Sequence, residues 1–283
     1  MKKFLWIIIS LFPFLPLVAQ QEIPGKEYGL ISVNNTFYLG GMQLLDSYLS
    51  PLEYRGMSLR FENDRKRFFS TENTNLSMQS RINVTIGMAR NPARSAMMNY
   101  LAFNYGWGMY YHIRPVANLQ ILAGGIADLD LGGKMVARNV NNPANADLAG
   151  NINASCIIQY SIPTRKRNLL LQAMIQVPLL GLMFVPEQGG SYYEMFSLGA
   201  LRNTAHFTFF HNKYGINQNY SIEIPFSKST LRLGFSSQFI KYTANNLVFK
   251  KLDYAFMIGW KQEIISFAGR NKKAPAGFVS VSL

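Results

Sequence analysis

Apolar and polar residues alternate along most of the chain with the period of two that a β-strand with two different faces requires. In the segment 77–89 apolar residues at even positions alternate with polar residues at odd positions. The apolar set is Met78, Ile82, Val84, Ile86 and Met88, and the polar set is Ser77, Gln79, Arg81, Asn83 and Thr85. The segment 101–112 has the same regularity, with large apolar residues at odd positions and mostly small or polar residues at even ones. Each pattern predicts a strand.

The alternation recurs in seven other places, at 28–40, 52–63, 119–131, 151–161, 169–177, 231–239 and 254–260. Several runs are longer than the roughly five or six residues usual in soluble sheets. They reach the length of about 9–11 residues that a tilted strand needs to cross a membrane. Their polar faces carry Asn, Gln, Ser, Thr and Gly rather than Lys and Glu. We therefore predict an all-β fold, a transmembrane antiparallel β-barrel.

The predicted strand number is about twelve, with ten or fourteen as alternatives. The apolar face changes parity between Phe209 and Tyr220, which requires either a turn within 211–218 or a bulge. A turn gives twelve strands, whereas a bulge gives about ten and a short final segment. The segment 278–283 alternates to the last residue and is predicted to be a closing strand.

The connections between the predicted strands differ in length. Short turns are predicted at 112–115, 163–166 and 225–228, and longer segments at 132–148, 177–203 and 243–251. Outer-membrane barrels have short periplasmic turns and longer outer loops, so we expect the short turns on the periplasmic side. The segment 64–73 should be periplasmic by counting, although it is moderately long.

The first nineteen residues have the pattern of a secretory signal peptide. Lys2 and Lys3 precede an apolar stretch that runs to Val18 and ends at the small residue Ala19. We predict a signal peptide at 1–19 and one barrel domain at 20–283. Export of this kind directs the chain to the outer membrane of a Gram-negative bacterium.

Composition agrees with a barrel and narrows the choice of partners. Hydrophobic residues make up 48% and charged residues 15% of the chain, against about 25% charged in soluble domains. The formal net charge is +13. The basic residues form short clusters at predicted turns, so we expect outer-membrane lipid and lipopolysaccharide as partners, with the barrel assembly machinery during biogenesis, and no nucleic acid. Cys156 is expected to be a small apolar residue on the lipid face, and neither a cofactor nor a metal is expected.

Two short motifs resemble a known family. The segments Tyr48-Leu-Ser-Pro-Leu-Glu-Tyr-Arg-Gly56 and Ala274-Pro-Ala-Gly-Phe-Val-Ser-Val281 are similar to those of exported barrel proteins of unknown function from gut-type Gram-negative anaerobes. The resemblance implies the barrel fold and the outer membrane. It implies no catalytic residues, because that family has no assigned activity.

Charged residues of both signs fall on the predicted inner face: Arg60, Glu62, Arg81, Asp128, Asp130, His206, Glu223, Arg232, Asp253 and Lys261. A wide diffusive pore often carries one dominant sign, whereas buried charges of both signs tend to pair. The mixture favours a narrow or plugged lumen.

Two sets of residues could carry chemistry. Asp128 and Asp130 lie two apart on one strand and could act as an acid–base pair or help to bind Ca²⁺, although pairing with Arg81 or solvation is the simpler expectation. His206 and Thr208 are weak catalytic candidates, because outer-membrane phospholipases with about twelve strands use Ser, His and Asn. Here the partner of His206 is Thr, which argues against that chemistry.

The segment 177–203 is the most distinctive loop, and Tyr192, Tyr193 and Phe196 are its candidate binding residues. Three functions stay open: a narrow or plugged barrel for transport or envelope structure, a surface-binding barrel that uses this loop, and a lipid-modifying enzyme. Of these, the enzyme is the least favoured.

Overall fold

The computed structural model describes residues 28–265, apart from 71–72, 140–141, 166, 200, 202 and 227–228, together with residues 278–279 and 281. The predicted signal peptide at 1–19 lies outside the described residues. No helix in the described part is both long and apolar enough to cross a membrane.

The described chain is almost entirely antiparallel sheet with one short helix. The strands are β1 (Tyr28–Asp46), β2 (Ser50–Phe68), β3 (Leu76–Arg90), β4 (Met97–Val116), β5 (Leu119–Val136), β6 (Ala144–Pro163), β7 (Asn168–Phe184), β8 (Ala205–Thr208), β9 (Lys213–Pro225), β10 (Thr230–Ala244), β11 (Leu247–Ile265) and β12 (Phe278–Val279). The helix α2 (Tyr192–Ser197) lies in the connection between β7 and β8.

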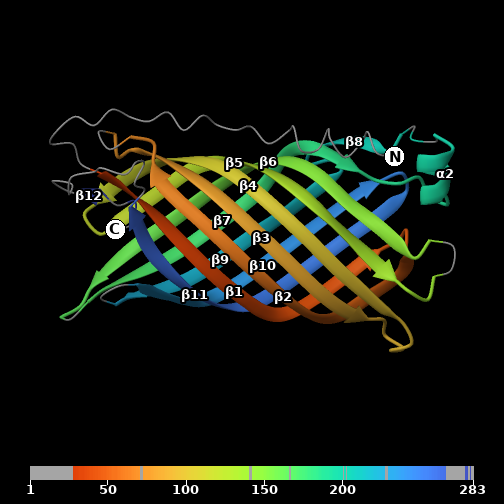
Figure 1. The fold of residues 1–283 in the computed structure, drawn as a ribbon, viewed down its shortest axis with the longest axis horizontal. Helices are drawn as coiled ribbons and strands as arrows, with labels where there is room; N and C mark the ends of the chain where they lie inside the picture. Colours follow the sequence, from red (N-terminus) through yellow and green to blue (C-terminus); the bar gives the residue numbers. More distant parts are fainter. Residues whose placement is uncertain are drawn as a thin grey trace, which may run out of the picture.

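Ten strands close the barrel, not the favoured twelve. The sheet runs from β1 to β7 in chain order, continues through β9, β10 and β11, and closes where β11 pairs with β1. The closing ladder is long, from Leu30 opposite Ile265 to Asp46 opposite Phe249. Figure 1 shows the tilted strands wrapped around one axis, with α2 at one end and β12 at the other.

The parity break explains the smaller number. β8 and β9 pair with successive stretches of the same edge of β7, so together they form one line of the barrel wall. A short turn at 209–212 interrupts that line, and opposite it β7 has a bulge at Leu179. On β7 and on the line formed by β8 and β9, the inward-pointing residues therefore change parity at the same level of the barrel. The bulge alternative was correct, although the interruption starts slightly earlier than the predicted 211–218.

Three other expectations are corrected. The closing strand is β11, because Phe278 and Val279 make a parallel two-residue pairing with the start of β1 instead. The predicted long segment 243–251 is a two-residue turn at Asn245 and Asn246, both with positive φ, between long strands. Most of the predicted segment 132–148 also belongs to β5 and β6, which leaves a connection of 137–143.

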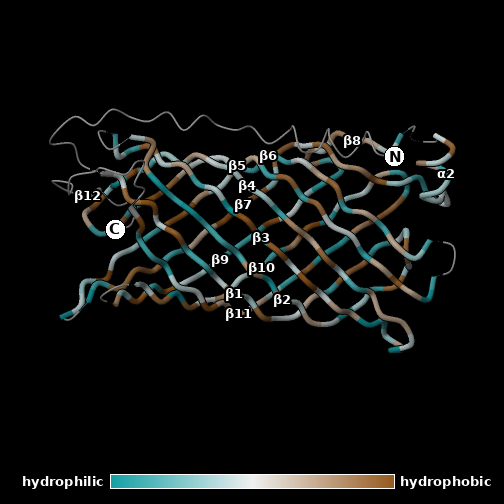
Figure 2. The backbone as a smooth tube through the Cα atoms, viewed as in Figure 1, coloured by the Kyte–Doolittle hydropathy of each residue, from teal (hydrophilic) through white to brown (hydrophobic). Residues whose placement is uncertain are grey.

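The two faces of the wall differ as the alternation predicts. On β11, Phe256 is 77% exposed whereas its neighbours Ala255 and Met257 are buried inside the barrel. The outward apolar side chains continue around the ring, and Figure 2 shows hydrophobic and hydrophilic positions alternating along most strands. The inward positions carry buried Asn, Gln, Ser, Thr, Arg and Glu. This inversion, apolar outside and polar inside, is what a barrel in lipid requires.

Candidate functional site

A buried lysine crosses the barrel below the end that carries α2. Lys134 of β5 has no exposed side-chain surface, and its Nζ lies 2.7 Å from Asp46 Oδ2 and 2.5 Å from Asp147 Oδ1. The same ammonium lies 3.7 Å from the centre of the Phe249 ring. β5 and β11 are five strands apart in either direction around the ring, so this contact spans the lumen. We call Lys134, Asp46, Asp147 and Phe249 the lysine bridge.

The connection between β7 and β8, residues 185–204, which we call the α2 loop, docks beside the lysine bridge through Tyr192. The Tyr192 hydroxyl donates to Asn145 Oδ1 and accepts from the backbone N–H of Ala146, each at 2.7 Å. Asn145 in turn donates to Asp46 Oδ2 at 2.8 Å. From the β1–β2 turn, the Tyr48 hydroxyl donates to the carbonyl of Gly190. A capping box between Ser191 and Glu194 starts the helix. These contacts hold the loop at this end of the barrel, against β6 and the β1–β2 turn.

The Tyr48 contact predicts how docking depends on pH. Partial burial, with the nearby Tyr192 and Asp46, raises the pKa of Tyr48 from 10 to about 12. Because the folded protein favours the neutral phenol, its stabilising effect is complete below pH 10 and is lost as the pH rises through 12. We expect a phenolate absorbance titration that differs between wild type and Tyr48→Phe by one group titrating near pH 12. A missing group with its midpoint near 10 would contradict the docked position.

A second polar layer crosses the middle of the barrel. The Arg60 guanidinium lies 3.7 Å from Asp253 Oδ1, donates to Ser236 and stacks over the Tyr38 ring. The Tyr38 hydroxyl donates to Glu62 at 2.9 Å. Towards the β12 end, Glu223 forms an ion pair with Lys261 at 2.6 Å and lies 3.8 Å from Arg232. The charged residues of these layers are paired and, apart from the partly exposed Lys261, buried, so they occupy the lumen at these levels.

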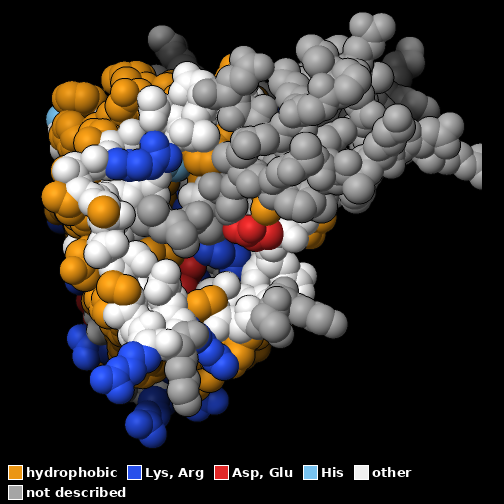
Figure 3. Space-filling view, turned by 90° about the vertical axis from the view of Figure 1, so that its left-hand side faces the viewer, with side chains coloured by type: hydrophobic (Ala, Val, Ile, Leu, Met, Phe, Trp, Pro, Cys, Tyr) orange, Lys and Arg blue, Asp and Glu red, His pale blue; other side chains and the backbone are white. Residues whose placement is uncertain are grey.

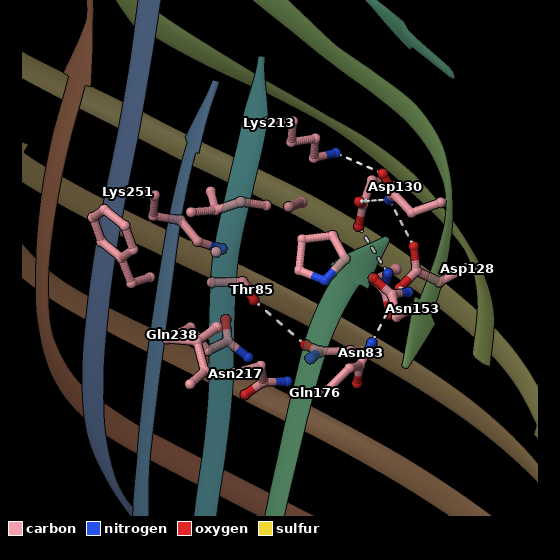
Figure 4. Close-up of a pocket in the computed structure, with 18 of the residues that line it drawn as sticks. Asn83, Thr85, Asp128, Asp130, Asn153, Gln176, Lys213, Asn217, Gln238 and Lys251 are labelled. Atoms are coloured by element: carbon pink, nitrogen blue, oxygen red, sulfur yellow. Dashed lines mark hydrogen bonds between the residues drawn. The ribbon is translucent and has the colours of Figure 1, made fainter. Parts of the chain in front are cut away.

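Between the lysine bridge and that layer lies a cavity of about 130 Å³, which we call the chamber. Asp128 and Asp130 of β5 form one wall, and Figure 4 shows both carboxylates on the same side of it. Asparagine amides hold them, since Asn151 Nδ2 lies 2.7 Å from Asp128 and 2.8 Å from Asp130, and Asn153 Nδ2 lies 2.6 Å from Asp128. Within the described residues neither carboxylate makes an ion pair, including with Arg81.

Three cations also line the chamber. Arg81 is 5% exposed, donates to Gln176 at 2.9 Å, and keeps its Nε without a hydrogen-bond partner. Lys213 is buried and donates to Asn151 Oδ1 at 2.6 Å. Lys251 of β11 points into the chamber from the wall opposite the two carboxylates (Figure 4). No carboxylate of the described chain lies within ion-pair distance of these three cations. The chamber therefore holds charges of both signs without a direct ion pair, and Lys251 is the cation that lies across from the two carboxylates.

The two catalytic candidates lie apart from this chamber. His206 and Thr208 are both on β8, opposite Met183 and Gly181 of β7. Asn212, the third polar residue nearby, donates to the carbonyl of Phe207 and accepts from the N–H of Phe209, so it holds the 209–212 turn. The His206 Nε2 is buried and makes no hydrogen bond with the described residues. This geometry supplies no nucleophile–base pair.

The loop candidates separate into two kinds. Tyr192 is the anchor described above, whereas Tyr193 and Phe196 expose 69% and 62% of their surface on α2. The described residues also contain no group of three or more His, Cys, Asp or Glu side chains that could hold a metal ion.

Sequence reasoning missed Lys134, Lys213 and Lys251, because all three lie in segments assigned to loops or to the parity break.

Comparison with solved structures finds outer-membrane barrels at low identity. The outer-membrane protease OmpT from Escherichia coli matches with a TM-score of 0.49 and 7% identity, covering 87% of this chain and 99% of that one. The translocator domain of the autotransporter NalP from Neisseria meningitidis gives 0.45 and 7%, covering 83% and 89%. The COG4313 outer membrane channel from Pseudomonas putida F1 gives 0.36 and 10%, covering 86% and 100%. These identities are too low to transfer an activity.

A comparison with curated proteins gives no match. The expectation of a family without an assigned activity is confirmed, because residues 4–271 match the model described as "Protein of unknown function (DUF3316)", and the chain belongs to that family.

Proposed function

We propose that the chain is an integral outer-membrane barrel that passes a small polar solute through a gated interior, and that it is not an open diffusion pore. The observation that carries the proposal is the chamber, which lies below the lysine bridge and the docked α2 loop. A second cavity of about 90 Å³ shares Tyr100, Lys213 and Lys251 with the chamber and reaches Asp147 of the bridge. A solute in the chamber would therefore lie directly behind the closed end.

The other end supports the same reading. Figure 3 looks at the end that carries β12 and shows acidic and basic side chains in a hollow. A further small cavity there is lined by Asp64, Lys66, Glu223 and Lys261. Charged groups at both levels suit a polar solute rather than an apolar one, which would leave them unsolvated.

The outer membrane is the location that best fits the two faces of the wall. The long α2 loop would face the cell exterior and the shorter turns the periplasm, following the usual asymmetry of these barrels. Arg55 and Arg90 are exposed and lie opposite each other on β2 and β3 near the α2 end. Like charges in this position repel. Arg55 already has the Glu53 carboxylate at 3.0 Å, so the lipopolysaccharide phosphate that we propose as a partner there would lie against Arg90. Assembly would use the barrel assembly machinery.

Conductance in a planar bilayer tests the gate. We expect the wild type to show brief, infrequent openings, and a variant lacking 187–198 to open much more often, because Tyr192 and the Gly190 carbonyl are removed. The matched control is Tyr193→Ala, which removes an exposed side chain, keeps the Tyr192 anchor and the Phe196 ring stacked on it, and should leave the openings unchanged.

Two results would overturn this proposal. A steady open-pore current in the wild type would mean that the interior is not closed. A silent deletion variant, shown by its gel mobility to be folded, would favour an envelope-structural barrel.

A second candidate is surface binding by the α2 loop, favoured by the exposure of Tyr193 and Phe196 beside exposed Leu198. Large exposed apolar groups on a loop often mark an interaction site. Binding of whole cells or purified protein to glycan and lipid arrays that is unchanged by Tyr193→Ala and Phe196→Ala would exclude this use of the loop.

A further inference from the structure

The chamber has two poles of opposite charge on opposite walls. Asp128 and Asp130 belong to β5, and Lys251 belongs to β11, five strands away in either direction around the ten-strand ring. Figure 4 shows the Lys251 ammonium directed across the chamber, with Asn217 and Gln238 on its side. Gln176 lies on the acidic side, where its amide is 3.4 Å from Asp128 Oδ2. The arrangement differs from the rest of the interior, where Arg60, Lys134 and Glu223 all have partners of opposite charge nearby.

Separated poles of this kind are costly to keep in a folded protein. A buried charge is stabilised when a group of opposite charge lies against it, and is destabilising when that group is missing. Amides donate to every oxygen of the two carboxylates but bring no positive charge. Arg81, which is 5% exposed, makes one hydrogen bond and leaves its Nε without a partner. The Oδ1 atom of Asn217 is also buried without a partner at the chamber wall. These groups point to a ligand that brings both charges.

We propose that the chamber binds a small zwitterion of the size of an α-amino acid. Its ammonium group would lie at Asp128 and Asp130, its carboxylate at Lys251, and its remaining polar atoms at Asn217 and Gln238. The volume is suitable, because a cavity of about 150 Å³ accommodates a molecule as large as benzene, and the chamber measures about 130 Å³. The inference deepens the proposed function by naming its solute class.

Because a bound ligand stabilises the folded protein, binding at this site can be measured as a change in stability, without any transport step. The full mature chain is folded from urea into detergent with glycine present, so that access to the chamber does not depend on the gate. A ligand that binds the folded state alone raises the unfolding midpoint as its concentration rises. Methylammonium chloride, sodium acetate and glycerol, each at the same concentration, supply one charge or none.

We expect glycine to raise the midpoint in the wild type beyond any rise given by methylammonium and acetate together. Lys251→Met and Asp130→Asn should each weaken the apparent affinity for glycine at least tenfold. The matched control is Lys250→Met, because Lys250 is the neighbouring residue on β11 but lies 3.5 Å from Glu53 and is partly exposed. Any general effect of glycine on stability persists in all variants and is subtracted by this comparison.

Three outcomes would overturn the inference. The first is an equal midpoint in all four solutes, the second is a response to methylammonium as strong as that to glycine, and the third is a glycine effect unchanged by Lys251→Met. The test is also distinct from that of the gate. Glycine binding in a barrel that never conducts would refute passage and keep the site, whereas conduction without glycine binding would do the reverse.

Discussion

Lys134→Met should destabilise the barrel by about 3–5 kcal/mol, the cost of leaving buried charges without their partner. Lys134 is completely buried and is the cation between Asp46 and Asp147, so its removal leaves two carboxylates facing each other inside the lumen. Methionine keeps the length of the side chain and its contact with Phe249, which restricts the change to the charge. Urea unfolding in detergent, followed by the mobility shift between folded and unfolded barrel on a gel, measures the loss.

The partners of Lys134 supply the internal test. Adding Asp46→Asn and Asp147→Asn to Lys134→Met removes the unpaired carboxylates, so the triple variant should recover most of the lost stability. Lys250→Met is the surface control, because its ion pair with Glu53 is partly exposed and exposed pairs contribute about 0–1 kcal/mol. A Lys134→Met variant no less stable than Lys250→Met would show that the lysine bridge does not hold the barrel together.

Phe256→Arg should cost about 2–4 kcal/mol if the outer face of the wall lies in a bilayer, as expected for a charge near the midplane of a membrane barrel. Phe256 is central in β11, is 77% exposed, and lies between Leu39 and Phe235 of the neighbouring strands. The same substitution on a wall surrounded by water would change stability by only about 0.5 kcal/mol.

Tyr193→Arg on α2 is the matched control, because it places an arginine at another exposed aromatic position, 69% exposed, outside the barrel wall. Guanidinium unfolding in lipid vesicles gives both values. If the two variants are equally mild, the apolar belt is not in lipid and the proposed location fails. A large loss for Phe256→Arg alone supports the membrane position.

The alternation of side chains was enough to predict the barrel and its two faces. Arg60, Arg81 and Glu223 lie inside because each follows the parity of its own strand, which a one-residue shift would invert. The number of strands could not be fixed in the same way. A parity change near Phe209 is compatible with a turn or a bulge, and the choice depends on β7, whose own bulge at Leu179 lies opposite.

The chamber was predicted in part, since Asp128, Asp130 and Arg81 lie in clear alternating runs. Lys251 of the chamber and Lys134 of the lysine bridge lie in segments that were assigned to loops, because Gly132, Gly133 and the two asparagines at 245–246 resemble turn residues. Following the parity of β5 four residues further would have placed Lys134 on the inner face. The contact across the lumen, by contrast, depends on which strands are opposite each other in the ring, and no local pattern contains that information.

The ladder between β1 and β11 has a consequence for how the chain could be cut and rejoined. Leu30 and Ile265 are neighbours across this ladder, so the start and the end of the wall lie side by side. A short linker between them, with new termini at Asn245 and Asn246, would give a circular permutant in which every ladder of the ring is retained. In that rearranged chain, β11 would be the first strand synthesised, although the folded wall would be the same. The order in which the strands are made could then be changed without changing the final structure.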